Sequence, residues 1–234
     1  MRDDQPIIIT IDGPAGTGKS TVSRRLATEL GLDFLDTGAM YRAAAAIMID
    51  KGIGRDAVDD LVATVYDADL HFDWHKDPPA ILAWDEPIEH RIRDEDVTDL
   101  VSFVATVPQL REHMVRKQRV IWGQHPRLVS EGRDQGSVAF PDAPVKFYLD
   151  AEPLIRARRR MDQLGIDAST MSVQEMCQRI IERDRIDSTR SDGPLLCPDD
   201  AIRVDTSDLD IDGVVGELAR RARERLEALA RKSS

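Results

Sequence analysis

One stretch constrains this chain more than any other: residues 13–21, which read Gly-Pro-Ala-Gly-Thr-Gly-Lys-Ser-Thr. Residues 6–12 before it are a short apolar run rich in β-branched side chains, typical of a buried strand. Residues 21–30 after it carry apolar side chains at helical spacing, and Gly31 is a candidate C-cap. Strand, glycine-rich loop and helix in this order are the context of the phosphate-binding loop with the pattern G-x-x-x-x-G-K-[ST].

This loop can hold a triphosphate for three physical reasons. Glycines let backbone N–H groups approach phosphate oxygens without an intervening side chain. The N-terminus of the following helix adds a partial positive charge, and Lys19 adds a full one. We therefore predict that the chain binds a nucleoside triphosphate. The predicted binding residues are Gly13, Pro14, Ala15, Gly16, Thr17, Gly18, Lys19, Ser20 and Thr21.

The net charge of the chain limits the kinds of molecule that it is expected to bind. The chain has 234 residues and a formal net charge of −11, so a general nucleic-acid or membrane-surface binder is disfavoured, because both partners are polyanions. Arginine dominates its basic residues, and the planar guanidinium suits phosphate. We expect local arginine clusters to be pockets for small anions, with no nucleic-acid or membrane partner.

The cellular setting is predicted from what the sequence contains. Its two cysteines are too few for a disulfide framework, so reduced thiols are expected. No signal peptide is visible before the first strand, and no apolar run approaches membrane-spanning length. We expect a cytoplasmic protein.

The order of elements predicts the fold class. Strand patterns alternate with helical ones along the chain, as at 127–130 and 145–149, which indicates a doubly wound parallel sheet. Residues 71–89 interrupt this alternation with three short runs typical of antiparallel strands. We therefore predict an α/β fold of the P-loop NTPase type. It carries an inserted lobe with a small antiparallel sheet and a short helical lid.

Missing motifs separate the classes of P-loop protein. A switch GTPase should carry an Asn-Lys-x-Asp motif, and a transporter ATPase a Ser-Gly-Gly-Gln signature; the sequence has neither. An arginine-rich helical pair late in the chain suits a lid that excludes water and neutralises charge during phosphoryl transfer. These features favour a small-molecule kinase.

Four further motifs carry a specific resemblance. They are Asp36-Thr37-Gly38-Ala39-Met40-Tyr41-Arg42, Glu131-Gly132-Arg133-Asp134-Gln135-Gly136, Phe140-Pro141-Asp142-Ala143-Pro144-Val145-Lys146 and Arg183-Asp184-Arg185-Ile186-Asp187-Ser188-Thr189-Arg190. Together with the P-loop they resemble bacterial cytidylate kinases over nearly the whole chain. The resemblance implies ATP-dependent phosphorylation of CMP and dCMP to CDP and dCDP by direct in-line transfer, with Mg²⁺ as cofactor.

The resemblance also implies how the chain is divided. We expect one kinase domain whose core comprises residues 1–37, 108–155 and 195–234. The insert that binds the nucleoside monophosphate is expected at 38–107, and the lid at 156–194. The protein is expected to act as a monomer on the small molecules ATP and CMP or dCMP.

Binding of the monophosphate requires cations, and base choice requires a hydrogen-bond pattern. Arg42 and Arg133 each follow a predicted strand end, where ligands bind in open α/β folds. Cytosine presents an amino donor where uracil presents a carbonyl, so a carboxylate accepts from the first and repels the second. The resemblance gives this carboxylate to Asp134. The residues predicted to bind CMP are Thr37, Tyr41, Arg42, Ser102, Arg111, Arg133, Asp134, Arg183, Asp187 and Arg190.

Within this set the resemblance assigns parts of the ligand. Arg190 would join the phosphate contacts, and Arg183 is a candidate for phosphate or sugar. Ser102 and Arg111 match positions that meet the acceptors N3 and O2 of the ring, and Asp187 would lie near the ribose.

Catalysis needs no protein nucleophile, because the acceptor phosphate oxygen attacks the γ-phosphorus directly. We predict catalytic roles for Lys19, Arg133 and, from the arginine-rich helix, Arg159. The Ser20 hydroxyl is a candidate Mg²⁺ ligand. Asp36 and Glu131 are candidate partners of the metal through water, and Glu131 stands where Asp is usual in the family.

Two other functions stay open at this point. One is a different P-loop small-molecule kinase, such as a uridylate/cytidylate enzyme, in which Asp134→Asn would leave base preference unchanged. The other is a nucleotide-binding regulatory module that has lost turnover. The intact Lys19 and the arginine set argue against the second alternative.

Overall fold

The computed structural model describes residues 5–167 and 169–232, and these form two compact units. The first unit comprises residues up to 34 and from 122 onward, and the second comprises residues 35–121. The strands form one five-stranded and one three-stranded sheet. This arrangement confirms the predicted α/β class with a small additional antiparallel sheet.

The first unit contains the larger sheet and the phosphate loop. Its sheet has the order β2-β6-β1-β7-β8, and the pairings of β1 with β6 and β7, and of β7 with β8, are parallel. Its elements are β1 (Ile7–Asp12), α1 (Lys19–Leu30), β2 (Asp33–Asp36, which ends in the second unit), β6 (Arg127–Gly132), the π-helix η1 (Gln135–Ala139), β7 (Val145–Asp150), α6 (Pro153–Leu164), α7 (Val173–Thr189), β8 (Ile202–Asp205) and α8 (Ile211–Lys232).

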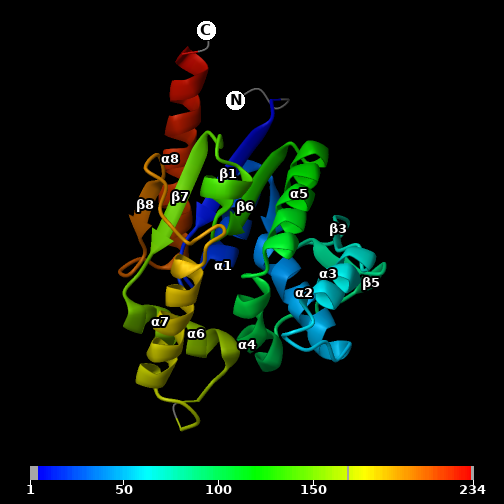
Figure 1. Cartoon of the computed structure of the whole chain (residues 1–234). Helices are drawn as coiled ribbons and strands as arrows, with labels where there is room; N and C mark the ends of the chain where they lie inside the picture. The colour runs from blue at the N-terminus through cyan, green and yellow to red at the C-terminus, as the bar shows by residue number, and fades with distance from the viewer. Residues whose placement is uncertain (1–4, 168, 233–234) are drawn as a thin grey trace. The chain divides into compact units, whose positions relative to one another are not determined.

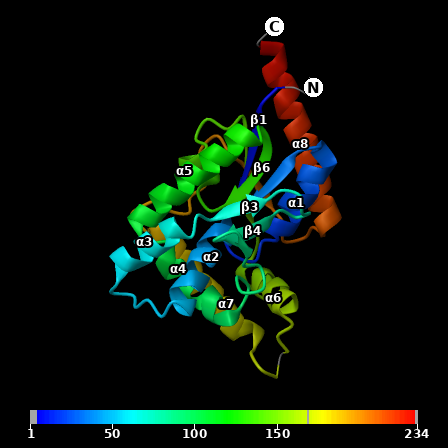
Figure 2. The ribbon, with the colours of Figure 1, turned by 90° about the vertical axis from the view of Figure 1, so that its right-hand side faces the viewer.

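The core of the first unit lies between the sheet and two helices. Every residue of β1 is buried, as expected for a central strand flanked by parallel neighbours. Ile9 of β1 and Leu26 of α1 share one hydrophobic cluster with Leu218 of α8, so α1 and α8 pack on the same side of the sheet (Figures 1 and 2). No helix within residues 5–167 and 169–232 is both long and apolar enough to cross a bilayer.

The helices α6 and α7 form a hairpin with its own small core, and they lie side by side in both views (Figures 1 and 2). Ala157 and Met161 of α6 cluster with Met176, Cys177 and Ile180 of α7. A capping box at the start of α7, in which Ser172 and Glu175 bond reciprocally, fixes where that helix begins. Together these helices place a run of charged side chains close to the phosphate loop.

The second unit holds the small sheet and, among the described residues, the helices α2, α3, α4 and most of α5. Its strands β3, β4 and β5 are antiparallel, as predicted for residues 71–89. The elements are α2 (Thr37–Asp50), α3 (Val58–Asp67), β3 (His71–Asp73), β4 (Ala80–Ala83), β5 (Glu86–Pro87), α4 (Glu95–Val104) and α5 (Pro108–Gln124, whose last turn belongs to the first unit). The helix α2 is almost entirely buried.

Two boundaries differ from those that the residue pattern predicts, which are a helix over the alanine-rich stretch from Ala43 to Lys51 and a loop from Ser188 to Asp200. The helix expected from Ala43 begins at Thr37, because the Asp36 side chain caps it by accepting the Ala39 N–H at 3.0 Å. Arg42 therefore lies on a helix and does not directly follow a strand end. The loop expected from Ser188 begins after Thr189, where α7 ends.

Candidate functional site

The phosphate loop joins β1, the central strand of the sheet, to α1. Gly13 has φ +148°, and a Cβ there would overlap the carbonyl oxygen of Leu149 on β7. Gly16 has φ +81°, and a Cβ there would lie 2.7 Å from the carbonyl oxygen of Arg156 on α6. Both positions therefore require glycine for their backbone conformation and for close packing. The motif closes on the first turn of α1, where helix N–H groups can meet an anion.

Lys19 is buried at the start of α1 and points back into its own loop. Its Nζ donates to the Pro14 carbonyl oxygen at 2.6 Å. Burial and, to a lesser extent, the charge of Arg133 lower the pKa of Lys19 to about 7, against the opposing effect of Glu131 and Asp12. A polyanionic ligand beside this side chain would favour its charged, protonated form.

Asp12 is a site residue that the sequence analysis did not single out. Its carboxylate is buried at the end of β1 and accepts the backbone N–H groups of Gln135 at 2.8 Å and Gly136 at 2.7 Å. These bonds fix η1, and with it the chain that directly follows Asp134. Burial, and to a lesser extent the charge of Asp134, raise the pKa of Asp12 to about 7, against the opposing effect of the two backbone hydrogen bonds. An acidic residue ending the strand before a P-loop was the available signal.

Arg133 and Asp187 are paired in this structure. Arg133 Nε lies 3.0 Å from Asp187 Oδ2, and Arg190 NH1 lies 3.9 Å from Asp187 Oδ1. Burial opposes ionisation of Arg133, but Asp187 and Glu131 raise its pKa. Burial also raises the pKa of Asp187, yet Arg133, Arg183 and Arg190 outweigh it and hold that pKa below its ordinary value. Three arginines predicted to bind CMP thus gather around the carboxylate of a fourth predicted residue, Asp187.

Asp134 is almost fully buried directly after β6, with 4% of its surface exposed. The Gln135 side-chain amide lies 3.5 Å from Asp134 Oδ1. A buried carboxylate in this position can accept a hydrogen bond from an exocyclic amine, as the prediction requires.

Ser20, at the end of the P-loop, and Glu131 on β6 are in direct contact. The Ser20 hydroxyl donates to Glu131 Oε1 at 2.5 Å. A hydroxyl and a carboxylate are the hard oxygen ligands that Mg²⁺ prefers, and Mg²⁺ usually takes only one or two protein ligands beside substrate phosphates and water. The residues present therefore fit the metal, although within the described ranges no three His, Cys, Asp or Glu side chains gather as a metal cluster. Asp36, the other candidate, caps α2.

The remaining predicted residues belong to the second unit. Arg42 NH1 on α2 donates to the Thr98 hydroxyl at 2.9 Å and to the Ile92 carbonyl at 3.3 Å. Arg111 is fully buried on α5, donates to the Ala105 carbonyl at 3.3 Å and lies 5.9 Å from the Tyr41 ring.

Thr37 and Ser102 are the other residues of the second unit that are predicted to bind CMP. Thr37 is the buried first residue of α2, and Ser102 lies half-buried on α4. The second unit thus holds five of the residues predicted to bind CMP, on three helices.

The arginine-rich helix α6 presents a different residue to the P-loop from the one predicted. Arg156 donates to the Ala15 carbonyl at 3.0 Å. Arg159 donates to the Thr206 side chain at 3.0 Å, to the Thr206 carbonyl at 2.7 Å and to the Leu209 carbonyl at 3.2 Å. Arg159 therefore holds the loop between β8 and α8 here, and its catalytic role stays a prediction.

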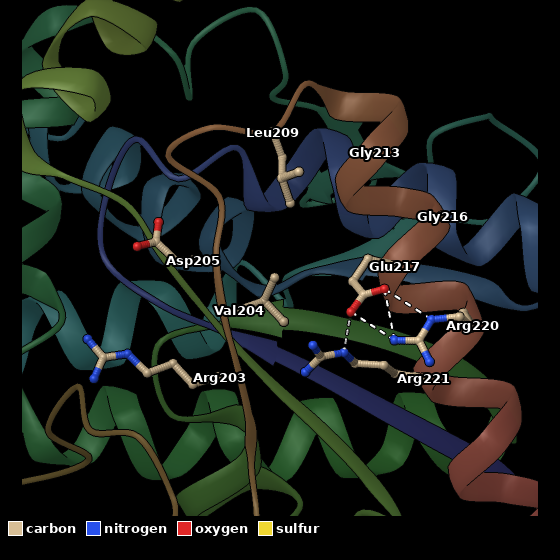
Figure 3. Close-up of a pocket in the computed structure, with 9 residues that line it drawn as sticks. All are labelled: Arg203, Val204, Asp205, Leu209, Gly213, Gly216, Glu217, Arg220 and Arg221. Carbon is tan, nitrogen blue, oxygen red and sulfur yellow. Dashed lines mark hydrogen bonds and ion pairs between the residues drawn. The ribbon is translucent and has the colours of Figure 1, made fainter.

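That loop also borders a cavity of about 540 Å³ between β8 and α8 (Figure 3). Arg220 and Arg221 both turn to Glu217 on the same helix, at 2.9 and 2.6 Å (Figure 3). The lining residues include none that the sequence analysis predicted to bind a ligand. Since these guanidinium groups already pair with a carboxylate, the cavity is a poorer phosphate site than the P-loop.

Comparison with known proteins identifies a family that matches most of this chain. A family model described as "Cytidylate kinase" matches residues 9–224. The cytidylate kinase of Methylococcus capsulatus is 43% identical over 216 residues, which are 92% of this chain and 96% of that protein. The cytidylate kinase of Rhodopirellula baltica is 42% identical over 228 residues, 97% of each chain. These findings confirm the resemblance that the motifs indicated.

A solved structure supports the fold independently. A gluconokinase from Sinorhizobium meliloti matches with a TM-score of 0.52 and 13% identity, covering 98% of each chain. At this level of identity the likeness concerns the fold alone, and it agrees with the P-loop kinase architecture predicted from the sequence.

Proposed function

This chain belongs to the cytidylate kinase family, and we propose that it transfers the γ-phosphoryl group of ATP to CMP and dCMP. An oxygen of the monophosphate attacks the γ-phosphorus in line, the bond to the β–γ bridging oxygen breaks, and ADP leaves. The products are CDP or dCDP. Positioning and charge stabilisation carry such a reaction, so the relevant residues are those that bind phosphate.

The observation that carries this proposal is the pair that follows β6. Arg133 and the buried Asp134 lie in the same unit as the P-loop. Arg133 lowers the pKa of Lys19 in the loop, and Asp134 raises the pKa of Asp12, the residue that precedes the loop. One residue offers a cation to a phosphate and the next a carboxylate to the cytosine amine.

We propose that the residues of the second unit bind the same CMP molecule. Arg42 would share the monophosphate with Arg133 and Arg190, while Ser102 and Arg111 would meet the ring acceptors. Thr37 and Tyr41 would complete the pocket, and Arg183 and Asp187 would hold phosphate and ribose. On this proposal residues 38–107 are the substrate insert and 156–194 the lid of one kinase domain.

The donor side follows from the P-loop. Residues 13–21 would bind the ATP phosphates. Lys19 would be a catalytic residue that contacts the transferred phosphoryl group. Ser20 and Glu131 would hold Mg²⁺, which supplies neutralising charge to the phosphates when bound. Their hydrogen bond of 2.5 Å, which brings the two oxygens together beside the loop, supports this proposal. We further propose a cytoplasmic monomer that acts on free nucleotides and not on nucleic acid.

A coupled assay of ADP release with CMP, dCMP, UMP, AMP and GMP tests this function. We expect CMP and dCMP to be phosphorylated fastest, and Lys19→Met to lower kcat on both by about 10²- to 10³-fold. Faster turnover of UMP or AMP would contradict the proposal. Calorimetry that detects CMP binding while no product forms would instead indicate a binding module without turnover.

A further inference from the structure

Two side chains from the α6–α7 hairpin hold the P-loop at Ala15. Asp184 on α7 accepts the Ala15 N–H through Oδ1 at 3.3 Å. Arg156 on α6 donates to the Ala15 carbonyl through NH1 at 3.0 Å. The same NH1 lies 2.5 Å from Asp184 Oδ2, so the carboxylate, the guanidinium and the loop form one closed set of contacts.

From this geometry we infer that Asp184 and Arg156 are positioning residues for the ATP phosphates. They fix the two successive peptide groups on either side of Ala15, and thereby the backbone turn on which the phosphates are proposed to lie. The inference rests on the proposed binding of ATP by this loop. Neither residue was among those predicted to bind a nucleotide.

Arg156 is suited to this task by its burial and its packing. Only 5% of its surface is exposed, and its Nε is held by the Ala151 carbonyl at 3.0 Å. Its backbone lies so near the loop that only glycine fits at position 16. The start of α6 and the P-loop are therefore packed backbone to backbone, and a shift of one moves the other.

Asp184 also reaches the acceptor side electrostatically. Its charge is among those that raise the pKa of Arg133, against the effect of burial. The side chain of Asp184 has 18% of its surface exposed, and that of Arg156 has 6%, so the pair is only weakly screened by solvent. A single carboxylate thus links α7, the donor loop and an arginine proposed to bind the acceptor.

The variant Asp184→Asn distinguishes a role in positioning the P-loop from a role in folding alone. Asparagine keeps an oxygen that can accept the Ala15 N–H but loses the charge that holds Arg156. We expect KM for ATP, and Kd for a non-hydrolysable ATP analogue, to rise about 10- to 100-fold because the loop loses its fixed geometry. KM for CMP and the preference for CMP over UMP should change less than threefold.

The matched control is Glu182→Gln, two residues earlier on the same helix. Glu182 pairs with Arg185 at 2.7 Å, but both side chains are more than half exposed. This control should leave both KM values unchanged. A role limited to folding would lower the active fraction and the melting temperature of Asp184→Asn while both KM values and the analogue Kd stayed at their original values.

A second variant keeps the inference testable if Asp184→Asn does not fold. Arg156→Lys retains the positive charge but cannot serve Ala15, Ala151 and Asp184 at once, since it lacks the planar fork. It should weaken analogue binding in the same direction. Unchanged analogue affinity in either folded variant would overturn the inference. Because binding is measured without CMP, the result does not depend on whether CMP is the true acceptor.

Discussion

The two units of the molecule hold their candidate site residues in different ways. In the first unit, charged groups are held by one another or by the loop itself: Arg133 pairs with Asp187 at 3.0 Å, and Lys19 donates to its own loop at 2.6 Å. In the second unit, Arg42 is positioned by the Thr98 hydroxyl and the Ile92 carbonyl, groups that carry no net charge.

Because of this difference, we expect mutations in the two units to affect protein stability and CMP affinity differently. An ion pair with little exposure is expensive to break, because the remaining charge is left without compensation. The Thr98 hydroxyl and the Ile92 carbonyl fix the direction of the Arg42 guanidinium. Substitutions in the first unit should therefore change stability together with activity, with Lys19 as an informative exception. Substitutions in the second unit should change mainly the affinity for CMP.

The largest effect is expected from Lys19→Met. Loss of a preorganised cation at the transferred group should lower kcat by about 10²- to 10³-fold. Burial lowers the pKa of Lys19 to about 7, which means that the folded protein disfavours its charge, so the substitution should leave the melting temperature unchanged or raise it. Steady-state kinetics and thermal melting check both parts. A large fall in melting temperature would contradict this account of the loop.

The next effect concerns base choice. Asp134→Asn replaces a pure acceptor by an amide that can also donate to the uracil carbonyl. We expect the ratio of kcat/KM for CMP over UMP to fall about 10- to 100-fold, the range of one well-placed base contact. An unchanged ratio would show that Asp134 does not read the base and would favour a kinase that accepts both pyrimidines.

A matched pair of variants tests the comparison between the units. Arg133→Met and Arg42→Met should each raise KM for CMP about tenfold or more. Only Arg133→Met should also lower the free energy of unfolding, by roughly 2–3 kcal/mol, since it leaves Asp187 buried without its nearest cation. Urea unfolding measures this difference. Equal destabilisation by the two variants would break the distinction.

The smallest effect is a dependence on pH. Lys19 loses its proton as pH rises through about 7, and Asp12 gains negative charge in the same range, so both changes disfavour an anionic ligand above pH 7. Affinity for ATP should fall about fivefold between pH 7 and pH 8, with proton uptake on binding. Calorimetry in buffers of different ionisation enthalpy measures that uptake. Lys19→Met should reduce it, and uptake equal to that of the unmodified chain would contradict this assignment.

The sequence predicted the elements whose signals are local. The P-loop, the buried strand before it and the antiparallel run at 71–89 all follow from spacing and composition, and the structure contains them. The residue pattern places the start of α2 too late, at Ala43, because it does not show that Asp36, the last residue of β2, also caps the helix. Such a cap depends on the backbone angles of one residue, which the pattern alone does not specify.

Tertiary contacts account for the rest. Helical spacing predicts that Arg156, Arg159 and Arg160 share one face of α6. Only the packing of that helix decides that Arg156 contacts the P-loop. Asp12 and Asp184 accept backbone N–H groups from segments far away in the chain. A backbone donor has no signature in the sequence, so the residue pattern does not show which N–H groups these two carboxylates accept.

The most direct test is a crystal structure of the chain with CMP and a non-hydrolysable ATP analogue. The account predicts that one CMP phosphate accepts hydrogen bonds from both Arg42 and Arg133, with the cytosine amine donating to Asp134 and Lys19 on the analogue. A CMP phosphate bound by only one of the two arginines, or a base that points away from Asp134, would contradict the claim that both units serve one acceptor.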